Sequence, residues 1–259
     1  DDDDYDLADT EHCTGTTGTA AAVPDKVYPG FSETAGSIAD RSGTVIRSDG
    51  STVIKLYFDR SINTVSYAYT GAVTDVTPPA LPAAATYRYG QSVTLAAAPT
   101  LPGYDFSGWS LLPDLTVSNG CFVMPDGPVA VTGSWTPRSD TPYTVEYYQQ
   151  HTDDDDYDLA DTEHCTGTTG TAAAVPDRTY PGFSETAESI ADRSGTVIKS
   201  DGSTVIKLYY DRSTNPVSYA YTGAATDVTP PALPAAATYR YGQSVTLANA
   251  PALPGYDFS

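Results

Sequence analysis

The chain repeats itself almost letter for letter at a spacing of 152 residues, so that residues 1–107 and 153–259 differ at only ten positions. The differences are Lys26/Arg178, Val27/Thr179, Gly36/Glu188, Arg47/Lys199, Phe58/Tyr210, Ile62/Thr214, Thr64/Pro216, Val73/Ala225, Ala97/Asn249 and Thr100/Ala252. Most of them are chemically mild. Copies this similar indicate recent duplication within a longer array. Enzymes are rarely duplicated whole in tandem, whereas stalks and adhesins commonly are, so the repeat favours a structural or interaction role.

The repeat period is too long for a solenoid, whose units have about 20–50 residues. We therefore divide each repeat into two dissimilar modules, A and B. The A modules are expected at residues 1–60 and 143–212, and the B modules at 64–138 and 216–259. The connectors are only a few residues long, and short connectors that contain proline restrict motion. The expected arrangement is a beaded, semi-rigid rod in which each module has neighbouring repeats as partners.

The residue content favours strands over helices. The chain has 20 Tyr, and its 21 Gly and 20 Pro are spread along its length rather than gathered in one linker. Tyr, Thr and Val suit a half-buried pleated surface, and Gly and Pro punctuate turns. The composition therefore predicts a mainly β fold, α+β at most, built from small modules with many short strands.

In the A module, strands are expected at Tyr143–Gln150 and Tyr157–Cys165, with the acidic run between them as a loop tip. Residues 184–193 suggest one or two helical turns, a pattern that Gly36 weakens in the first copy. The strongest local pattern is a hairpin over residues 195–210, closed by an Asp-Gly turn.

The second arm of that hairpin alternates between apolar and other residues. Ile206, Leu208 and Tyr210 should face the core, while Lys207 and Tyr209 should face away from it.

In the B module, strands are expected around Val65–Tyr69, Ser92–Leu95, Cys121–Met124 and Val129–Thr136. The large apolar residues of its second half are expected to form one aromatic core. They are Tyr104, Phe106, Trp109, Phe122, Met124, Val131 and Trp135.

The B module resembles the Listeria–Bacteroides repeat, also called the internalin-type B repeat. The resemblance is carried by Gly103–Trp109 (GYDFSGW), by the Met124–Pro125 turn and by Trp135 at the end of the last strand. This pattern is fairly specific for that family.

The A module is similar, more loosely, to the MucBP-like (mucin-binding-protein-like) repeat. The match rests on the order and spacing of four segments: Tyr143–Tyr148, Gly167–Gly170, Tyr180–Phe183 and Lys207–Arg212. Together the two resemblances cover nearly the whole chain. They imply β-grasp, ubiquitin-like modules of secreted or wall-anchored bacterial proteins, and they carry no catalytic residues.

The charge of the chain limits the classes of partner that it can bind. The formal net charge is -20, and the segment Asp1–Glu11, which occurs twice, holds seven acids and no base. Such a surface repels nucleic-acid phosphates and anionic membranes, so we expect neither as a partner. No apolar run of 18 or more residues is present, so no membrane insertion is expected in this segment.

The acidic run invites comparison with a Ca²⁺ loop. Asp2, Asp4 and Asp6, and their copies Asp154, Asp156 and Asp158, have the alternating spacing with which an EF-hand loop begins. The glycine at the sixth position and the glutamate at the twelfth are missing, which favours a solvated hairpin tip. We therefore expect no metal site and no cofactor.

The Glu-His-Cys segments and the three cysteines could suggest a metal site, a nucleophile or disulfide bonds, but the sequence supports none of these. In Glu11-His12-Cys13 and its copy Glu163-His164-Cys165, neighbours on a strand point to opposite faces, so the His and Cys would not converge. The third cysteine, Cys121, lies in a different module, and the three imply no disulfide framework. With no nucleophile elbow, phosphate loop or dinucleotide fingerprint, we expect no catalytic site and no enzyme activity.

Two alternatives concern exposed strand residues. Lys55 and Lys207 could form isopeptide bonds in a stalk, but their alternation points them outward. The Tyr rows could stack on sugars, although such rows more often pack within a sheet. The Tyr residues concerned are Tyr67, Tyr69, Tyr87 and Tyr89.

The sequence thus predicts a non-catalytic, extracellular repeat region that acts as the stalk of an adhesin and contacts host mucin, glycan or matrix protein. The alternatives are a lectin-like glycan-binding module and an accessory region of a larger secreted enzyme. Both ends look cut from a longer protein. The first A copy lacks a counterpart of Tyr143–Gln150, and the second B copy stops before its last strands, so each end module should expose part of its core.

Overall fold

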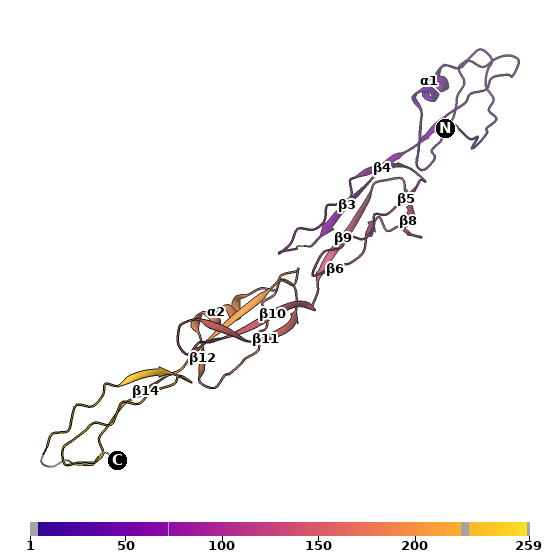
Figure 1. The fold of residues 1–259 in the computed structure, drawn as a ribbon. Coiled ribbons are helices and arrows are strands. Elements are labelled where there is room, and N and C mark those ends of the chain that lie inside the picture. Colours follow the sequence, from indigo (N-terminus) through magenta and orange to yellow (C-terminus); the bar gives the residue numbers. More distant parts are fainter. Residues whose placement is uncertain (1–4, 72, 224–227, 258–259) are drawn as a thin grey trace. The chain divides into compact units, whose positions relative to one another are not determined.

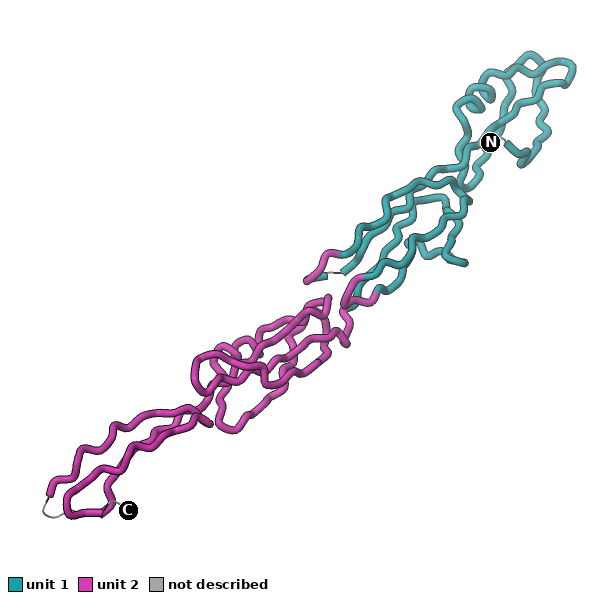
Figure 2. Tube along the Cα trace, viewed as in Figure 1, with its two compact units in different colours: residues 1–73, 78–100, 106–136 teal, residues 74–77, 101–105, 137–259 magenta. Residues whose placement is uncertain are grey.

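The computed structural model describes residues 5–71, 73–223 and 228–257. They form fifteen short strands and two helices, so the fold is mainly β (Figure 1). The chain divides into two compact units (Figure 2). The first consists of residues 1–73, 78–100 and 106–136, and the second of residues 74–77, 101–105 and 137–259.

A four-stranded mixed sheet is the framework of the A module in the second unit. Its strand order is β11-β10-β13-β12. The strands are β10 (Thr141–Gln150), β11 (Tyr157–Gly167), β12 (Phe183–Glu185) and β13 (Val205–Arg212). The central pair, β10 and β13, is parallel, whereas β11 and β12 pair antiparallel at the two edges.

The core of this sheet follows from the two-residue period of its central strands, because alternate side chains of a strand point to the same face. In β13, Ile206, Leu208 and Tyr210 are 2%, 0% and 2% exposed, and Lys207 faces solvent, as the alternation predicts. The inward residues of β10 are equally buried and join the same cluster: Tyr143, Val145 and Tyr147.

The expected helical turns form in both copies, as α1 (Ala35–Gly43) and α2 (Ala187–Gly195). Each begins after a threonine whose hydroxyl accepts a hydrogen bond from the backbone N–H three residues on, Thr34 from Ser37 and Thr186 from Ser189. Such an N-cap contributes about 1 kcal/mol. The cap precedes the Gly36/Glu188 difference, so the helix survives the glycine.

The hairpin expected over residues 195–210 is only partly right. The Asp-Gly turn forms, with the Gly202 N–H donating to the Lys199 carbonyl at 3.1 Å. The two arms do not pair with each other, however. The first arm exchanges hydrogen bonds of 2.9 Å with residues 170–173 through Thr196 and Ile198, while the second arm lies between β10 and β12. The turn is local, whereas the first arm bonds with an earlier segment in both copies, Ile46 with residues 18–19 and Ile198 with residues 170–171.

The B module of the first unit is built on a second mixed sheet, in the order β4-β3-β9-β6, with β7 also on β9. The strands are β3 (Ile62–Thr70), β4 (Ala85–Arg88), β6 (Tyr104–Phe106), β7 (Ser110–Leu112) and β9 (Val129–Pro137). β3 and β9 are parallel. A separate ribbon pairs β5 (Ser92–Thr94) with β8 (Cys121–Val123).

The single aromatic core expected in the B module forms for all of the expected residues except Tyr104. Phe122, Met124 and Val131 do share one buried cluster, with Trp109 at its edge. Phe106 and Trp135 join this cluster through Trp109 and Tyr69, and the ring centroids of these four residues lie 4.8–6.4 Å apart. Val131 and Trp135 lie on the same face of β9, because alternate residues of a strand point to the same side. Tyr104 is outside this core and lies in the second unit, where its hydroxyl donates to Asp75.

In the described part of the two remaining modules there are fewer strands. In the first A copy, β1 (Phe31–Glu33) pairs with β2 (Phe58–Arg60) in the same register as β12 with β13. In the second B copy, β14 (Thr214–Val217) pairs with β15 (Ala237–Arg240). Among the described residues no helix is long and apolar enough to cross a membrane.

Candidate functional site

The acidic residues with Ca²⁺-loop spacing can be followed in the second copy, where two of them meet at a histidine. Asp2 and Asp4 lie outside the described residues. In the second copy, His151 lies 2.8 Å from Asp154 and 3.1 Å from Asp158, and Asp155 pairs with Arg240. Across the described part of the chain, no three His, Cys, Asp or Glu side chains gather as metal ligands. Asp154, Asp155 and Asp158 thus lie in ion-pair contacts with His151 or Arg240.

His151 is a partner of the acidic loop that the pattern analysis missed. The hydrogen bond to Asp158, together with the charges of Asp154 and Asp158, raises the pKa of His151 above its usual value despite some desolvation. Its position immediately before Thr152 and the acidic run is the signal that could have identified it.

The other candidate residues also lie in ordinary surroundings. The three cysteines are free thiols, and in the second copy the nearest partner of the His164 ring is the Thr144 hydroxyl, at 3.4 Å. Lys55 and Lys207 are exposed, as expected.

The Tyr rows are engaged in packing. Tyr67 and Tyr69 contact Trp109 at 5.1 and 6.0 Å between ring centroids, and Tyr87 packs on the core of the B module. Tyr89 meets the A module, where its ring lies 5.9 Å from that of Phe31. These four rings therefore serve internal contacts, and they do not form an open row for stacking on sugars.

The contact between an A module and the B module that follows it is the feature that both copies share in detail. A single residue separates the last A strand from the first B strand, Ser61 in the first unit and Ser213 in the second. The Ser61 N–H donates to the Gly30 carbonyl, and the Tyr89 N–H donates to the Ser61 carbonyl, each at 2.8 Å. The Ser213 bonds to Gly182 and Tyr241 have the same lengths. Backbone hydrogen bonds thus run continuously through the junction.

One arginine side chain completes the A–B junction in each unit. In the second unit, Arg212 donates to the Gln150 carbonyl at 2.6 Å and to the Tyr241 carbonyl at 2.8 Å, and its guanidinium lies 4.7 Å from the centre of the Phe183 ring. Arg60 repeats the bond to Tyr89, at 2.9 Å, and the contact with Phe31, at 5.2 Å. Arginine suits this position because its planar fork bonds and stacks at the same time.

The close approach of Tyr89 and Tyr241 requires glycine in the A module. Gly30 and Gly182 have φ values of +76° and +77°. A Cβ at either position would lie 2.3 Å from the tyrosine ring. Both the backbone conformation and the space therefore select glycine. In the first unit, Asp126 adds hydrogen bonds from the Gly30 N–H, at 3.0 Å, and from the Ser61 hydroxyl, at 2.7 Å.

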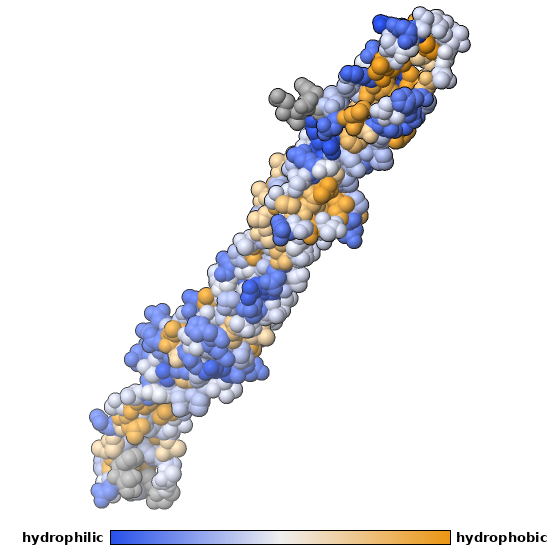
Figure 3. Space-filling view, turned by 90° about the vertical axis from the view of Figure 1, so that its right-hand side faces the viewer, coloured by the Kyte–Doolittle hydropathy of each residue, from blue (hydrophilic) through white to orange (hydrophobic). Residues whose placement is uncertain are grey.

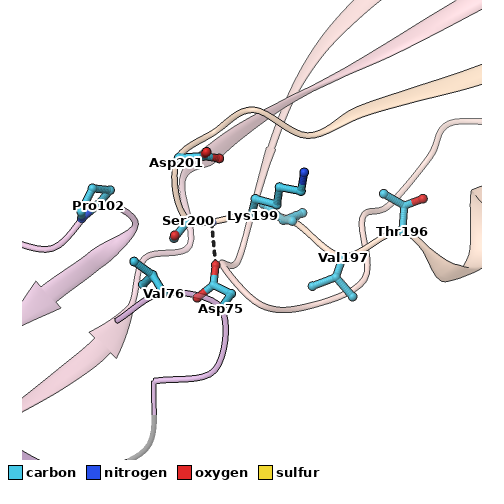
Figure 4. A pocket seen from close by; sticks show the side chains of 9 residues that line it. Asp75, Val76, Pro102, Thr196, Val197, Lys199, Ser200 and Asp201 are labelled. Carbon is cyan, nitrogen blue, oxygen red and sulfur yellow. Dashed lines mark hydrogen bonds between the residues drawn. The ribbon is translucent and has the colours of Figure 1, made fainter. Parts of the chain in front are cut away.

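A different set of contacts lies within the second unit, where the B-module loops 74–77 and 101–105 meet the next A module. The Asp75 carboxylate accepts hydrogen bonds from the Tyr104 hydroxyl and from the Ser200 N–H, each at 2.7 Å (Figure 4). Gly103 lies so close to Ser200 that a Cβ would fall 2.7 Å from its backbone, and the Gly103 carbonyl accepts from the Thr169 hydroxyl at 2.9 Å. A hollow remains beside Asp75, walled by Val76, Pro102 and residues 196–201.

The charge state of Asp75 suits its place as the acceptor of two hydrogen bonds. Partial burial opposes its negative charge, but the hydrogen bonds from Tyr104 and Ser200 outweigh the burial and hold the pKa of Asp75 below its usual value. A charged Asp75 is thus an acceptor at neutral pH. Nothing in the local sequence marks Asp75, because its partners are distant in the chain.

Comparison with known families identifies one module. Residues 64–139 match the model of the divergent InlB B-repeat domain, a family typical of bacterial surface proteins. This finding supports the resemblance of the B module to Listeria–Bacteroides-type repeats. No curated protein matches the chain.

Proposed function

We propose that the chain is a non-catalytic repeat region of a bacterial surface or secreted protein, in which A and B modules alternate to form the stalk of an adhesin. The observation that carries the proposal is the A–B junction, whose hydrogen bonds, arginine and glycine recur in both copies. One-residue connectors with backbone hydrogen bonds across them limit the freedom of a module relative to the next. A stalk needs this property, whereas a set of independent binding modules does not.

We further assign both modules to the β-grasp class. Support comes from the order of strands: in each complete module the first and last strands are parallel neighbours at the centre of the sheet, β10 with β13 and β3 with β9. The second strand lies at the outer side of the first in both sheets. The MucBP-like character of the A module rests on the sequence resemblance alone, since the family match covers residues 64–139.

Direct contact with host mucin, glycan or matrix is the second part of the proposal, and it also rests on that resemblance. We do not extend it to a lectin, because the Tyr rings that suggested sugar stacking pack internally. A mucin and glycan array probed with the full chain, with and without Ca²⁺, tests the contact. Saturable binding would support it, and a blank array would leave the chain as a spacer only.

Small-angle X-ray scattering of the full chain tests the stalk. A compact globule of this length has a radius of gyration of about 18 Å, and an unfolded chain about 56 Å. A stalk of folded modules should lie between these limits and should keep its value when salt is raised. A value near that of a compact globule would contradict the stalk.

A further inference from the structure

The first and last strands of the A module at 143–212 and of the B module at 64–138 lie side by side and run in the same direction. They are β10 and β13 in the A module, and β3 and β9 in the B module. Each pair is joined over six residue pairs, residues 144–149 with 205–210 and residues 65–70 with 129–134. The chain enters each module through the first strand of the pair and leaves it through the second.

The direction of the two strands decides how such a pair responds when the chain is pulled. In a parallel pair, the start of the first strand and the end of the second lie at opposite ends, so tension slides the strands along each other and loads all cross-strand hydrogen bonds together. In an antiparallel pair joined as a hairpin the two pulled ends lie next to each other, and tension opens the bonds one after another. Tension along this chain therefore loads both modules in the stronger geometry.

Sliding β10 along β13 would also separate the core of the A module. The inward residues of the two strands share one cluster and are at most 3% exposed. They are Tyr143, Val145 and Tyr147 on β10, and Ile206, Leu208 and Tyr210 on β13. By contrast, the apolar side chains on the face shown in Figure 3 form scattered patches among polar ones. The contacts that resist sliding thus lie in the interior, where hydrogen bonds are electrostatically stronger than in water.

The outward side chains of β10 and β13 also connect the two strands. Glu146 lies opposite Lys207, with 3.8 Å between the carboxylate and the ammonium group. Tyr148 lies opposite Tyr209, and the two rings stack with 5.1 Å between their centroids. Directly opposite pairs of this kind stabilise a sheet, and a slip of one residue would break both of them.

Hydrogen bonds close both ends of the β10–β13 pair. Near the start of β10, the Thr144 N–H donates to the Thr204 carbonyl at 3.0 Å. At the end of β13, the Arg212 guanidinium donates to the Gln150 carbonyl at 2.6 Å, and the Arg212 N–H donates to the Gln150 side chain at 3.1 Å. Bonded contacts therefore extend over the whole length along which the two strands overlap.

The B module has the same arrangement with different residues. Val65 on β3 and Val131 on β9 are 2% and 0% exposed and belong to one buried cluster. Gly133 lies opposite Tyr69 and leaves room for the Phe106 ring, because a Cβ at residue 133 would lie 2.4 Å from that ring. The parallel pair of first and last strands is thus a feature that the two dissimilar modules share.

We propose that the two parallel pairs, β10–β13 and β3–β9, are mechanical clamps with which the A and B modules resist unfolding under tension. The load enters a module at the start of one clamp strand and leaves it at the end of the other. The antiparallel edge strands β11 and β4 lie outside this path. The inference deepens the proposed stalk and rests on it for its use at a surface. Small-angle scattering decides the stalk, whereas pulling decides the clamp.

Pulling the A module in two directions tests its clamp. The full chain, with its three cysteines changed to alanine, is held in optical tweezers through handles at Asp140→Cys and Thr214→Cys, which load β10 against β13. A second variant carries handles at Asp140→Cys and Thr168→Cys, which peel the edge strand β11 from β10, because the start of β10 lies beside the end of β11.

We expect the first pair of handles to need at least about twice the rupture force of the second, because only the first loads the cross-strand bonds together. Rupture through the first pair should lengthen the chain by about 200–230 Å, the extension of one unfolded A module. A ratio of forces below about two would overturn the proposal.

The B module gives an independent test in the same background. Handles at Ile62→Cys and Ser139→Cys load β3 against β9, and handles at Ile62→Cys and Gln91→Cys peel the edge strand β4 from β3. Ile62 is 65% exposed, so the handle leaves the core intact. The same ratio of forces is expected, and a smaller one would overturn the proposal for this module.

Two proline variants separate the clamp from the rest of the A module. Alternate N–H groups of a strand point to the same side, so the Glu146 N–H faces β13 as the Thr144 N–H does. Glu146→Pro therefore removes one donor of the clamp. Thr162→Pro changes the residue directly opposite on the edge strand β11, where the N–H donates to the Asp161 carboxylate at 2.8 Å.

With handles at residues 140 and 214, Glu146→Pro should lower the rupture force by at least about a quarter, and Thr162→Pro should leave it within about a tenth. An equal effect of the two prolines would overturn the proposal. If Glu146→Pro does not fold, the two pulling directions still decide, because they compare a single folded module.

Discussion

The ring of Tyr89 lies against the backbone of Gly30, so close that a Cβ on the glycine would sit 2.3 Å from the ring. The residues come from different modules and are 59 positions apart in the chain. The pair Gly182 and Tyr241 repeats the contact in the second unit. The A–B junction is thus specified by shape as well as by hydrogen bonds.

Gly30→Ala should open the A–B junction of the first unit. Alanine meets both an unfavourable φ of +76° and the Tyr89 ring, and together these should cost about 2–4 kcal/mol. Amide exchange at Ser61 and Tyr89, read by NMR, should quicken by roughly tenfold or more.

Gly18→Ala is the matched control for this change. Gly18 has a similar φ of +79° but no atom within 4 Å of the added Cβ. It should therefore carry the backbone strain alone, about 1 kcal/mol, and leave the exchange of Ser61 and Tyr89 as it was. If the two variants behave alike at these amides, the close approach does not hold the junction.

Ser189→Ala should destabilise the complete A module. The Ser189 hydroxyl is buried and accepts from the Tyr209 N–H at 2.6 Å, so its loss leaves a donor without a partner in the interior. The expected cost is about 1–3 kcal/mol, measured from the exchange of the slowest amides in β13 during urea titration. Ser194→Ala, which removes an exposed hydroxyl bonded to the Ala191 carbonyl, should change the stability by less than about 0.5 kcal/mol. A similar effect of both changes would show that burial of Ser189 is unimportant.

The fold was predictable where the pattern is local. The alternation in residues 205–210 gave the buried face of β13, and the Asp-Gly pair gave the turn before it. The pairing of the arms was not predictable, because in both copies the first arm bonds with an earlier segment, and β13 pairs with β10, more than 50 residues away. Local sequence specifies turns, whereas sheet order depends on competition between distant strands.

The junctions were harder to predict than the modules. Asp75 and Ser200 are 125 residues apart, and neither belongs to a motif. Gly30 and Gly182 lie in the Tyr-Pro-Gly-Phe segment on which the resemblance of the A module to MucBP-like repeats partly rests. From the sequence alone, a glycine in this segment indicates only a turn. The acidic run and the Glu-His-Cys segments contain the residue types that most often bind metals. Among the described residues they form no group of three or more metal ligands. The repeat in the sequence indicates an array of modules, whereas the contacts between modules are visible only in the structure.

Arg212→Lys should loosen the A–B junction of the second unit despite keeping the charge. The guanidinium reaches two carbonyls and lies over Phe183, and an ammonium group cannot do all three at once. The Tyr241 amide, which donates to Ser213, should exchange about five to tenfold faster. Lys199→Arg is a suitable control, because it reproduces the residue that the first copy carries as Arg47. An unchanged Tyr241 in Arg212→Lys would mean that charge alone suffices.

His151 should make the acidic loop of the second copy sensitive to pH. The hydrogen bond to Asp158 and the charges of both carboxylates favour the protonated ring, so its folded-state pKa lies above the ordinary value of about 6.5. A raised pKa means that the contribution of the pair is fully present below the unfolded-state pKa and disappears as the pH rises through the folded-state pKa. NMR titration of the ring should therefore give a midpoint above 6.5, with loosening of residues 152–156 as the ring loses its proton. Asp158→Asn should bring the midpoint down, whereas Asp155→Asn, whose carboxylate pairs with Arg240 instead, should leave it nearly unchanged. An ordinary midpoint in the unaltered chain would mean that solvent screens both carboxylates and that the ring does not hold the loop.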